Sequence, residues 1–273
     1  MKDRIVVATD FSQSSLASLA KAIYLAKRNK CTLDVIHVVE YSVFHDPKKD
    51  KKAGKEALTK FISDHFPKPE VEISQFCYVG TIHKEIHKHI KDRECCLLVI
   101  GATGETQHIT DVLLGSVAKR IVRKAEIPVL VAKNESLSDY VNIFSPTDFS
   151  EQSLKTAKAA QKFFPTTNLV FYHMIARPFE LRLGHYGAND DQISNFNKEA
   201  ENKAKEVSKE FLHHFAGKAE IVLDSGILSY TRLLSVAESK HASLIALPTS
   251  GKISFFALDV LQYSNVDVFI CKF

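Results

Sequence analysis

The sequence contains an internal repeat, and this feature constrains the fold more than any other. Residues 5–12 read IVVATDFS and residues 143–150 read IFSPTDFS, so Asp148 follows Asp10 by 138 positions. Three further landmarks recur in the same order in both halves: an apolar run that ends near His37 or His173, a glycine turn at 80 or 226, and an apolar run at 97–100 or 244–247. The chain therefore consists of two copies of one domain, called here copy one (1–133) and copy two (140–273), joined by a polar linker at 134–139.

The pattern inside each copy predicts the fold class. Short runs rich in Val, Ile and Leu alternate with longer stretches of helical period, which is typical of a parallel sheet built from βαβ units. We expect an α/β fold, with two tandem open parallel five-stranded sheets flanked by helices in a Rossmann-like arrangement. In copy one the predicted strands lie near residues 4–9, 32–39, 70–78, 96–101 and 128–132. Ser12 and Ser150 are predicted N-caps of the first helix of each copy.

Composition limits the classes of binding partner that we expect and indicates the cellular compartment. The net charge is only +4, from 36 basic and 32 acidic residues, so a dedicated nucleic-acid binder is not expected. No apolar stretch approaches the roughly 18 residues of a membrane span, so no membrane partner is expected. The five cysteines form no C-x-x-C motif, and Cys95 and Cys96 are expected in the core, which is thiol usage typical of a reducing compartment. We therefore expect a cytoplasmic protein.

The segment after the fourth predicted strand of copy one carries the residues of a phosphate site. Gly101 and Gly104 would let the backbone approach a phosphate closely. Gly115 and Ser116 place free N–H groups and a hydroxyl at a helix N-terminus, where the helix dipole favours an anion. Asp10, at the end of the first strand, would border the same crevice, because ligands bind outside the carboxyl ends of the strands in open α/β sheets.

These motifs resemble those of the universal stress protein family. The resemblance rests on Thr-Asp-Phe-Ser at the first turn, His-Val at the end of strand two, and Gly-x-x-Gly through Gly-Ser before Pro-Val-Leu-Val, and it covers essentially the whole chain twice, as in the tandem type. It implies the adenine nucleotide alpha hydrolase type of fold and an adenine nucleotide, ATP, bound in copy one with or without Mg²⁺. It also implies that Asp10 and Val38 contact the nucleoside and that glycines 101, 104 and 115, with Ser116 and Val117, contact the phosphates. The full predicted cofactor-binding set is Ala8, Thr9, Asp10, Val38, Gly101, Gly104, Gly115, Ser116 and Val117.

Copy one departs from the family pattern in one respect. The family has nine residues between the second and third glycines, whereas residues 105–114 number ten. This loop carries Glu105, His108 and Asp111, and its carboxylates would repel a triphosphate unless a divalent cation intervened. An alternative is that Gly101 and Gly104 only terminate a strand.

Copy two departs much further from the motif. Pro248 replaces the first glycine, which removes a backbone donor, and Phe255 and Phe256 stand where a phosphate would sit. We expect copy two to be a scaffold, or a site for a less anionic ligand, with Asp148 capping the following helix. The chain would then bind one nucleotide.

No residue pattern points to demanding catalysis or to a metal ion. His83 and His87 lie one turn apart on a predicted helix, but no third ligand stands at a telling spacing, so the histidines at 83, 87 and 89 are expected on a solvated helix face. No catalytic residues are assigned, and slow ATP hydrolysis is the most that is expected. Two alternatives stay open: a weak ATPase, and a structural or partner-binding stress module that binds no nucleotide.

The fifth predicted strands suggest how the copies meet. Residues 128–132 and 266–271 would both be apolar edge strands, and exposed edges of this kind invite pairing. We expect them to pair antiparallel across a pseudo-two-fold axis, as the resemblance to dimeric family members also implies. The chain would then be an intramolecular pseudo-dimer, with a further homodimer left open.

Overall fold

The computed structural model describes residues 3–41, 46–102, 114–165, 167–176, 190–215, 217–249 and 254–272. The chain divides into two compact units. Unit 1 consists of Met1–Asp139 together with Thr249–Phe273, and unit 2 of Tyr140–Pro248. The C-terminal segment of copy two therefore packs with copy one. The bounds 1–133 and 140–273, which follow the repeat, stay a prediction.

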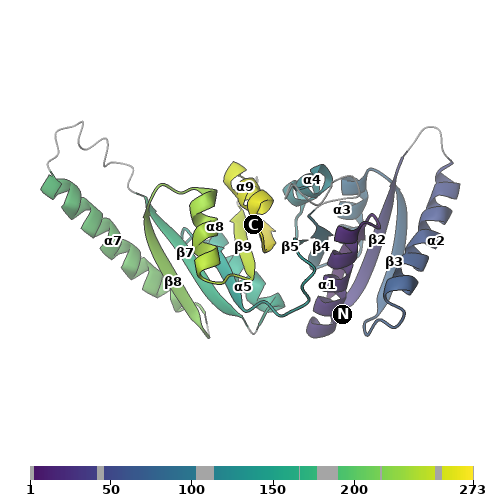
Figure 1. The fold of residues 1–273 in the computed structure, drawn as a ribbon, viewed down its shortest axis with the longest axis horizontal. Coiled ribbons are helices and arrows are strands. Elements are labelled where there is room, and N and C mark those ends of the chain that lie inside the picture. Colours follow the sequence, from purple (N-terminus) through teal and green to yellow (C-terminus); the bar gives the residue numbers. More distant parts are fainter. Residues whose placement is uncertain are drawn as a thin grey trace. The chain divides into compact units, whose positions relative to one another are not determined.

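Unit 1 contains six strands within its described residues. Four of them, β2, β3, β4 and β5, are labelled in Figure 1. The order of the six strands is β3-β2-β1-β4-β5-β10, with β1 to β5 parallel and β10 antiparallel to β5. Helix α1 packs on β1 and β4, and α3 packs on β2, β3 and α4. The elements are β1 (Arg4–Thr9), α1 (Gln13–Asn29), β2 (Thr32–Glu40), α2 (Pro47–His65), β3 (Ile73–Gly80), α3 (Ile82–Asp92), β4 (Leu97–Gly101), α4 (Ser116–Lys124), β5 (Val129–Ala132), α9 (Phe255–Tyr263) and β10 (Asp267–Lys272).

Unit 2 repeats the first part of this arrangement. Its strands follow the order β9-β6-β7-β8 and are parallel. The elements are β6 (Asn142–Pro146), α5 (Glu151–Phe163), β7 (Asn168–Ala176), α7 (Asp190–Leu212), β8 (Ala219–Gly226), α8 (Tyr230–Ser239) and β9 (Leu244–Thr249). None of the helices in the described residues is long and apolar enough to cross a membrane.

The local sequence explains where these elements form. The central strands β4 and β5 are continuous apolar runs, because a parallel sheet covered on both faces exposes neither side of its strands to water. Helices α1 and α5 begin after serine N-caps, as predicted: the Ser12 side chain accepts from the Ser15 N–H at 3.2 Å, and the Ser150 side chain accepts from the Ser153 N–H at 3.3 Å.

The α/β fold class, with a mostly parallel sheet and flanking helices, is confirmed. In copy one the predicted strands match the observed ones closely except β3, which begins at Ile73 because its ladder with β2 starts at the Leu33–Ile73 pair. The grouping of five strands per unit is not reproduced. The fifth strand of copy two, β10, lies in unit 1, where it completes the edge that β5 would leave open.

The predicted antiparallel pairing of the two fifth strands is present. Leu130 lies opposite Phe269, with Val131 opposite Val268 and Val129 opposite Ile270. Leu130 and Phe269 are fully buried, so this pairing is part of the core of unit 1.

A charged network also lies in the core of unit 1. Asp34 of β2 is fully buried and accepts hydrogen bonds from Arg4 at 2.7 Å, His89 Nε2 at 2.9 Å and Arg93 at 3.2 Å. His89 Nδ1 in turn lies 2.8 Å from the Tyr78 hydroxyl. These hydrogen bonds compensate the buried Asp34 carboxylate for the water that it has lost. An isolated charge in an apolar core would have no such compensation.

Candidate functional site

The described part of unit 1 contains a cavity of about 390 Å³ at the carboxyl ends of β1, β2 and β4. The first turns of α1, α3 and α4 complete its walls. The cavity brings together eight of the nine predicted cofactor-binding residues, namely Ala8, Thr9, Asp10, Val38, Gly101, Gly115, Ser116 and Val117. Gly104, and with it Glu105, His108 and Asp111, lies outside the described residues.

The turn between β1 and α1 forms one wall and fixes the position of Asp10. The Asp10 carboxylate accepts from the Ser12 N–H at 3.1 Å and from the Ser12 hydroxyl at 2.6 Å. Phe11 adopts a φ of 68°, which a side chain makes unfavourable, and its N–H donates to Thr9 Oγ1 at 3.0 Å. The hydrogen bonds hold this turn in place, so the exposed Asp10 carboxylate faces the cavity from a defined position.

The aromatic side chain of Phe11, in the same turn, stacks on His37 of β2. The two ring centroids lie 4.2 Å apart, and the His37 Nδ1–H donates to the Thr9 carbonyl oxygen at 2.9 Å. Copy two repeats both contacts: Phe149 has a φ of 63° and lies 4.3 Å from His173, whose Nδ1–H donates to Thr147 O at 2.8 Å. Because the stack also occurs in the copy with the degenerate phosphate loop, it is part of the domain architecture and does not by itself indicate a ligand.

Asp148, the counterpart of Asp10, does not cap the following helix as predicted, but it contacts the first turn of that helix. Its carboxylate accepts from the Ser150 N–H at 3.0 Å and from the Ser153 hydroxyl at 2.8 Å. Burial raises the pKa of Asp148, but the hydrogen bonds from Ser150 and Ser153 outweigh burial and lower this pKa below its ordinary value. The N-cap itself is Ser150, so Asp148 braces the first turn instead of capping it.

Gly101 has a structural reason to be glycine. A Cβ atom at this position would lie 2.5 Å from Ser14 Oγ and 3.0 Å from the Ser14 carbonyl oxygen. The first turn of α1 therefore packs directly on the end of β4. This close contact supports the alternative that the glycine serves the fold, whether or not a ligand also needs it.

We expect Gly101→Ala to lower the free energy of unfolding by about 1–3 kcal/mol, because the new methyl group must push the first turn of α1 outward. Urea denaturation measures this change. The added substitution Ser14→Ala removes the contact with Oγ but not the one with the carbonyl oxygen, so it should recover only part of the loss. An unchanged free energy of unfolding in Gly101→Ala would show that this packing contact is unimportant.

The N-terminus of α4 is built differently from that of its counterpart in copy two. Gly115 is the N-cap of α4, and no side chain in the described residues caps this helix. Helix α9 is capped by Ser254, whose hydroxyl accepts from the Ala257 N–H at 3.1 Å. The first-turn N–H groups of α4 are therefore suited to an external acceptor, whereas α9 already holds one of its own.

The charges of the cavity wall limit what it can bind. Among the described lining residues, Asp10 and Glu40 are acidic, and none is Lys, Arg or His. An anionic ligand here would depend on backbone N–H groups, on the positive end of α4 and on a cation that it brings with it.

The contacts of His83 on α3 do not favour a metal site. His83 Nε2 lies 3.2 Å from the Lys124 ammonium, which donates to it, and burial together with the charges of Lys124 and Arg120 lowers the pKa of His83. An ammonium group at this lone pair competes with a metal cation. The expectation of a solvated face is wrong for His89, which is buried because the Asp34 network binds it.

One group in the described residues, Asp34, His89 and Cys95, has metal-like spacing, with ligand atoms within 4.8 Å of one another. Two arginines already neutralise Asp34, and burial raises the pKa of the Cys95 thiol to about 12. The partners of Asp34 and His89 therefore have a structural explanation, and Cys95 is a core residue, as predicted.

The fold and the cavity define an α/β domain that can bind a small ligand at the carboxyl ends of its parallel strands. The universal stress protein family model matches residues 1–133. Universal stress protein MJ0531 of Methanocaldococcus jannaschii is 33% identical over 140 residues, which span 48% of this chain and 81% of that protein. The chain belongs to the universal stress protein family.

Solved structures match the fold over the whole chain, which agrees with the tandem type. A universal stress protein from Archaeoglobus fulgidus has a TM-score of 0.72 at 16% identity, covering 100% of this chain and 99% of that chain. A putative universal stress protein from Pseudomonas aeruginosa has a TM-score of 0.71 at 14% identity, covering 99% and 93% of the two chains.

Proposed function

We propose that this protein is a cytoplasmic stress-response protein that binds one adenine nucleotide, ATP, in the cavity of unit 1. The observation that carries the proposal is that eight predicted binding residues, from four separate stretches of the sequence, line one cavity beside the N-terminus of α4, which no described side chain caps. The cavity volume of about 390 Å³ lies within the range of small-molecule sites.

Each wall of the cavity suits a different part of the ligand. Gly115, Ser116 and the first-turn N–H groups of α4 would hold the phosphates, because the helix dipole stabilises negative charge there. Asp10 and Val38, at the ends of β1 and β2, would contact the nucleoside. Asp10 and Glu40 oppose the charge of a bare triphosphate, so we propose that ATP binds with Mg²⁺.

Copy two would serve as the pseudo-dimer partner and bind no nucleotide. Ser254 occupies the first turn of α9 with its own hydroxyl, and Phe255 beside it is 85% exposed. We also propose 1–133 and 140–273 as the bounds of the two copies. No nucleic acid or membrane is proposed as a partner.

A second function is that of a structural stress module without any nucleotide. It is favoured by Gly101, whose lack of a side chain is explained by Ser14 alone. The aromatic stack behind the first turn, present in both copies, has a structural explanation as well.

Titration calorimetry with ATP and MgCl₂ separates these functions. We expect one nucleotide per chain, and at least about tenfold weaker binding when EDTA replaces Mg²⁺ because the carboxylates then repel the triphosphate. Protein freed of copurified nucleotide by unfolding and refolding is the starting material. A stoichiometry near two would contradict the assignment of copy two, and no binding would favour the structural module.

A further inference from the structure

We propose that the buried ion pair between Lys21 and Asp267 selects the partner of each fifth strand, so that β5 of copy one pairs with β10 of copy two and neither pairs with its own kind in a second chain.

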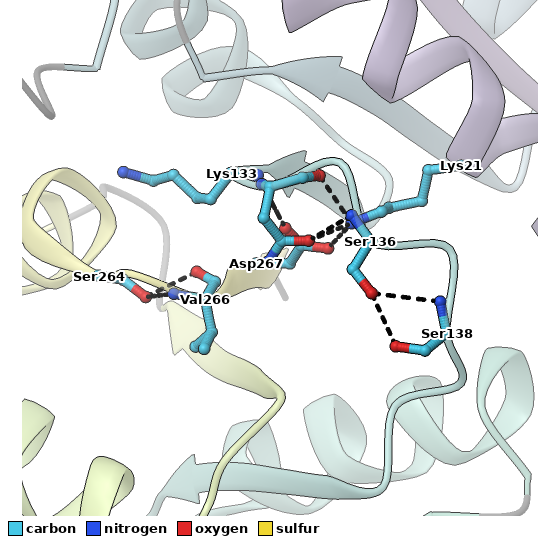
Figure 2. Close-up of polar contacts among 8 residues, drawn as sticks. Lys21, Lys133, Ser136, Ser138, Ser264, Val266 and Asp267 are labelled. Carbon is cyan, nitrogen blue, oxygen red and sulfur yellow. Dashed lines mark hydrogen bonds and ion pairs between the residues drawn. The ribbon is translucent and has the colours of Figure 1, made fainter. Parts of the chain in front are cut away.

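The ion pair is buried and fully satisfied (Figure 2). The Lys21 ammonium donates to Asp267 Oδ2 and, at 3.2 Å each, to the carbonyl and side-chain oxygens of Asn134. Asp267 Oδ1 accepts from the Lys133 N–H at 2.7 Å. Lys21 is 3% exposed and Asp267 is fully buried. The pair thus joins helix α1, the end of β5 and the start of β10.

The strand pairing around this ion pair is symmetric. Leu130 faces Phe269 at the centre of the pairing. A two-fold rotation about this centre exchanges the pair on one side, Val131 with Val268, with the pair on the other side, Val129 with Ile270. Adding 139 to a residue number of β5 gives its counterpart in β10. The backbone of either strand could therefore pair equally well with a second copy of itself.

The ion pair breaks this symmetry. The counterpart of Asp267 in copy one is Pro128, which has no acceptor side chain. The counterpart of Lys21, nine positions after the N-cap serine of its helix, is Ala159. Copy one therefore supplies only the lysine and copy two only the aspartate.

A second contact across the same junction is also one-sided. Lys119 of α4 donates to the side-chain oxygen of Gln262 of α9 at 3.1 Å. By their distances from the N-caps Gly115 and Ser254, the counterparts of these two residues are Leu258 and Arg123, which cannot form the same bond.

Pairing of like with like would bury uncompensated charge. Two copies of β5 would place Lys21 against Pro128 twice, and two copies of β10 would place Asp267 against Ala159 twice. Removing one partner of a buried pair typically shifts an equilibrium by more than about a hundredfold. Burial of the apolar strands β5 and β10 stabilises the pairing in general. The ion pair makes β5–β10 pairing more favourable than pairing of either strand with its own kind.

The test is a change of partner in the full-length chain. Asp267→Asn removes the existing pair, and Pro128→Asp gives β5 an acceptor for Lys21 of a second chain. We expect the double variant Pro128→Asp/Asp267→Asn to form dimers or larger oligomers at about 50 µM in sedimentation velocity, although intrachain pairing has an effective concentration near the millimolar range. Pro128→Asp alone should sediment like the wild type, because the original pair remains.

A stability measurement accompanies this test. Asp267→Asn should lower the unfolding temperature by about 10 °C, because it leaves the buried Lys21 ammonium without a counter-charge. Lys21→Met/Asp267→Asn, which removes both charges, should recover at least half of that loss. Glu70→Gln, which breaks the exposed Lys27–Glu70 pair, is the control and should have almost no effect.

The proposal is overturned if Pro128→Asp/Asp267→Asn sediments like the wild type. It is also overturned if Asp267→Asn unfolds at the wild-type temperature. If Asp267→Asn fails to fold, the variant Lys21→Met/Asp267→Asn, which removes both charges, is measured in its place. If this variant also fails to fold, the two charges act independently of each other, and the proposal is overturned.

Discussion

Gly115→Val is expected to abolish nucleotide binding and leave the fold intact. The backbone of Gly115 has φ −58° and ψ 150°, which any residue can adopt, and its N–H donates to the Ala102 carbonyl oxygen at 2.9 Å, a bond that valine can also make. Glycine is therefore not required here by backbone strain. A branched side chain at this N-cap would instead fill the space in front of the first-turn N–H groups of α4, where the phosphates are proposed to lie.

We expect the dissociation constant for ATP with Mg²⁺ to rise by at least about a hundredfold, measured by titration calorimetry, with an unchanged circular dichroism spectrum. Ser254→Ala, at the same position of α9, is the matched control. It should cost about 1 kcal/mol of stability through the lost cap and leave ATP binding unchanged. Wild-type affinity in Gly115→Val would place the phosphates elsewhere, and loss of the fold would show that the glycine is needed for packing.

Asp34→Ala is expected to lower the free energy of unfolding by about 3–5 kcal/mol, the largest stability effect that we predict. The substitution leaves Arg4, Arg93 and the buried His89 without their common acceptor. Guanidinium denaturation measures the loss. The matched control is Asp224→Ala in copy two, which removes the acceptor of Arg232 and Tyr172. Arg232 is 47% exposed, so water can replace the aspartate there, and the buried Tyr172 loses one hydrogen bond; the control should therefore cost only about 1–2 kcal/mol.

The same network predicts a dependence of stability on pH. Burial raises the pKa of Asp34, but hydrogen bonds from His89, Arg4 and Arg93 outweigh burial and hold this pKa below the ordinary value of 3.8. A carboxylate with a depressed pKa stabilises the folded state above that ordinary value, and the contribution is lost as the pH falls through the folded pKa. The difference in stability between wild type and Asp34→Ala should therefore shrink below pH 3.8. A difference that stays constant down to pH 3 would contradict this role of the charge.

The sequence alone was enough to predict the features that depend on local pattern. The repeat and the alternation of apolar runs with amphipathic stretches predicted the strands, because a covered parallel strand needs a continuous apolar run. Ser12 and Ser150 were recognisable as N-caps because a cap depends on residues within one turn. The gathering of the predicted binding residues in one cavity also followed, since parallel strands bring their carboxyl ends to one edge.

Only the tertiary structure decided which distant residues meet. Asp34 stands in an apolar strand without any local sign of a partner, and its partners lie 30, 55 and 59 positions away. Lys21 and Asp267 are separated by 246 positions, and the clash that requires Gly101 to be glycine comes from another element, at Ser14. Periodicity records which face of an element is buried, but not what covers that face. The packing of whole helices and strands determines which residue pairs with a buried charge and which position must be glycine. No regular spacing in the sequence indicates these contacts.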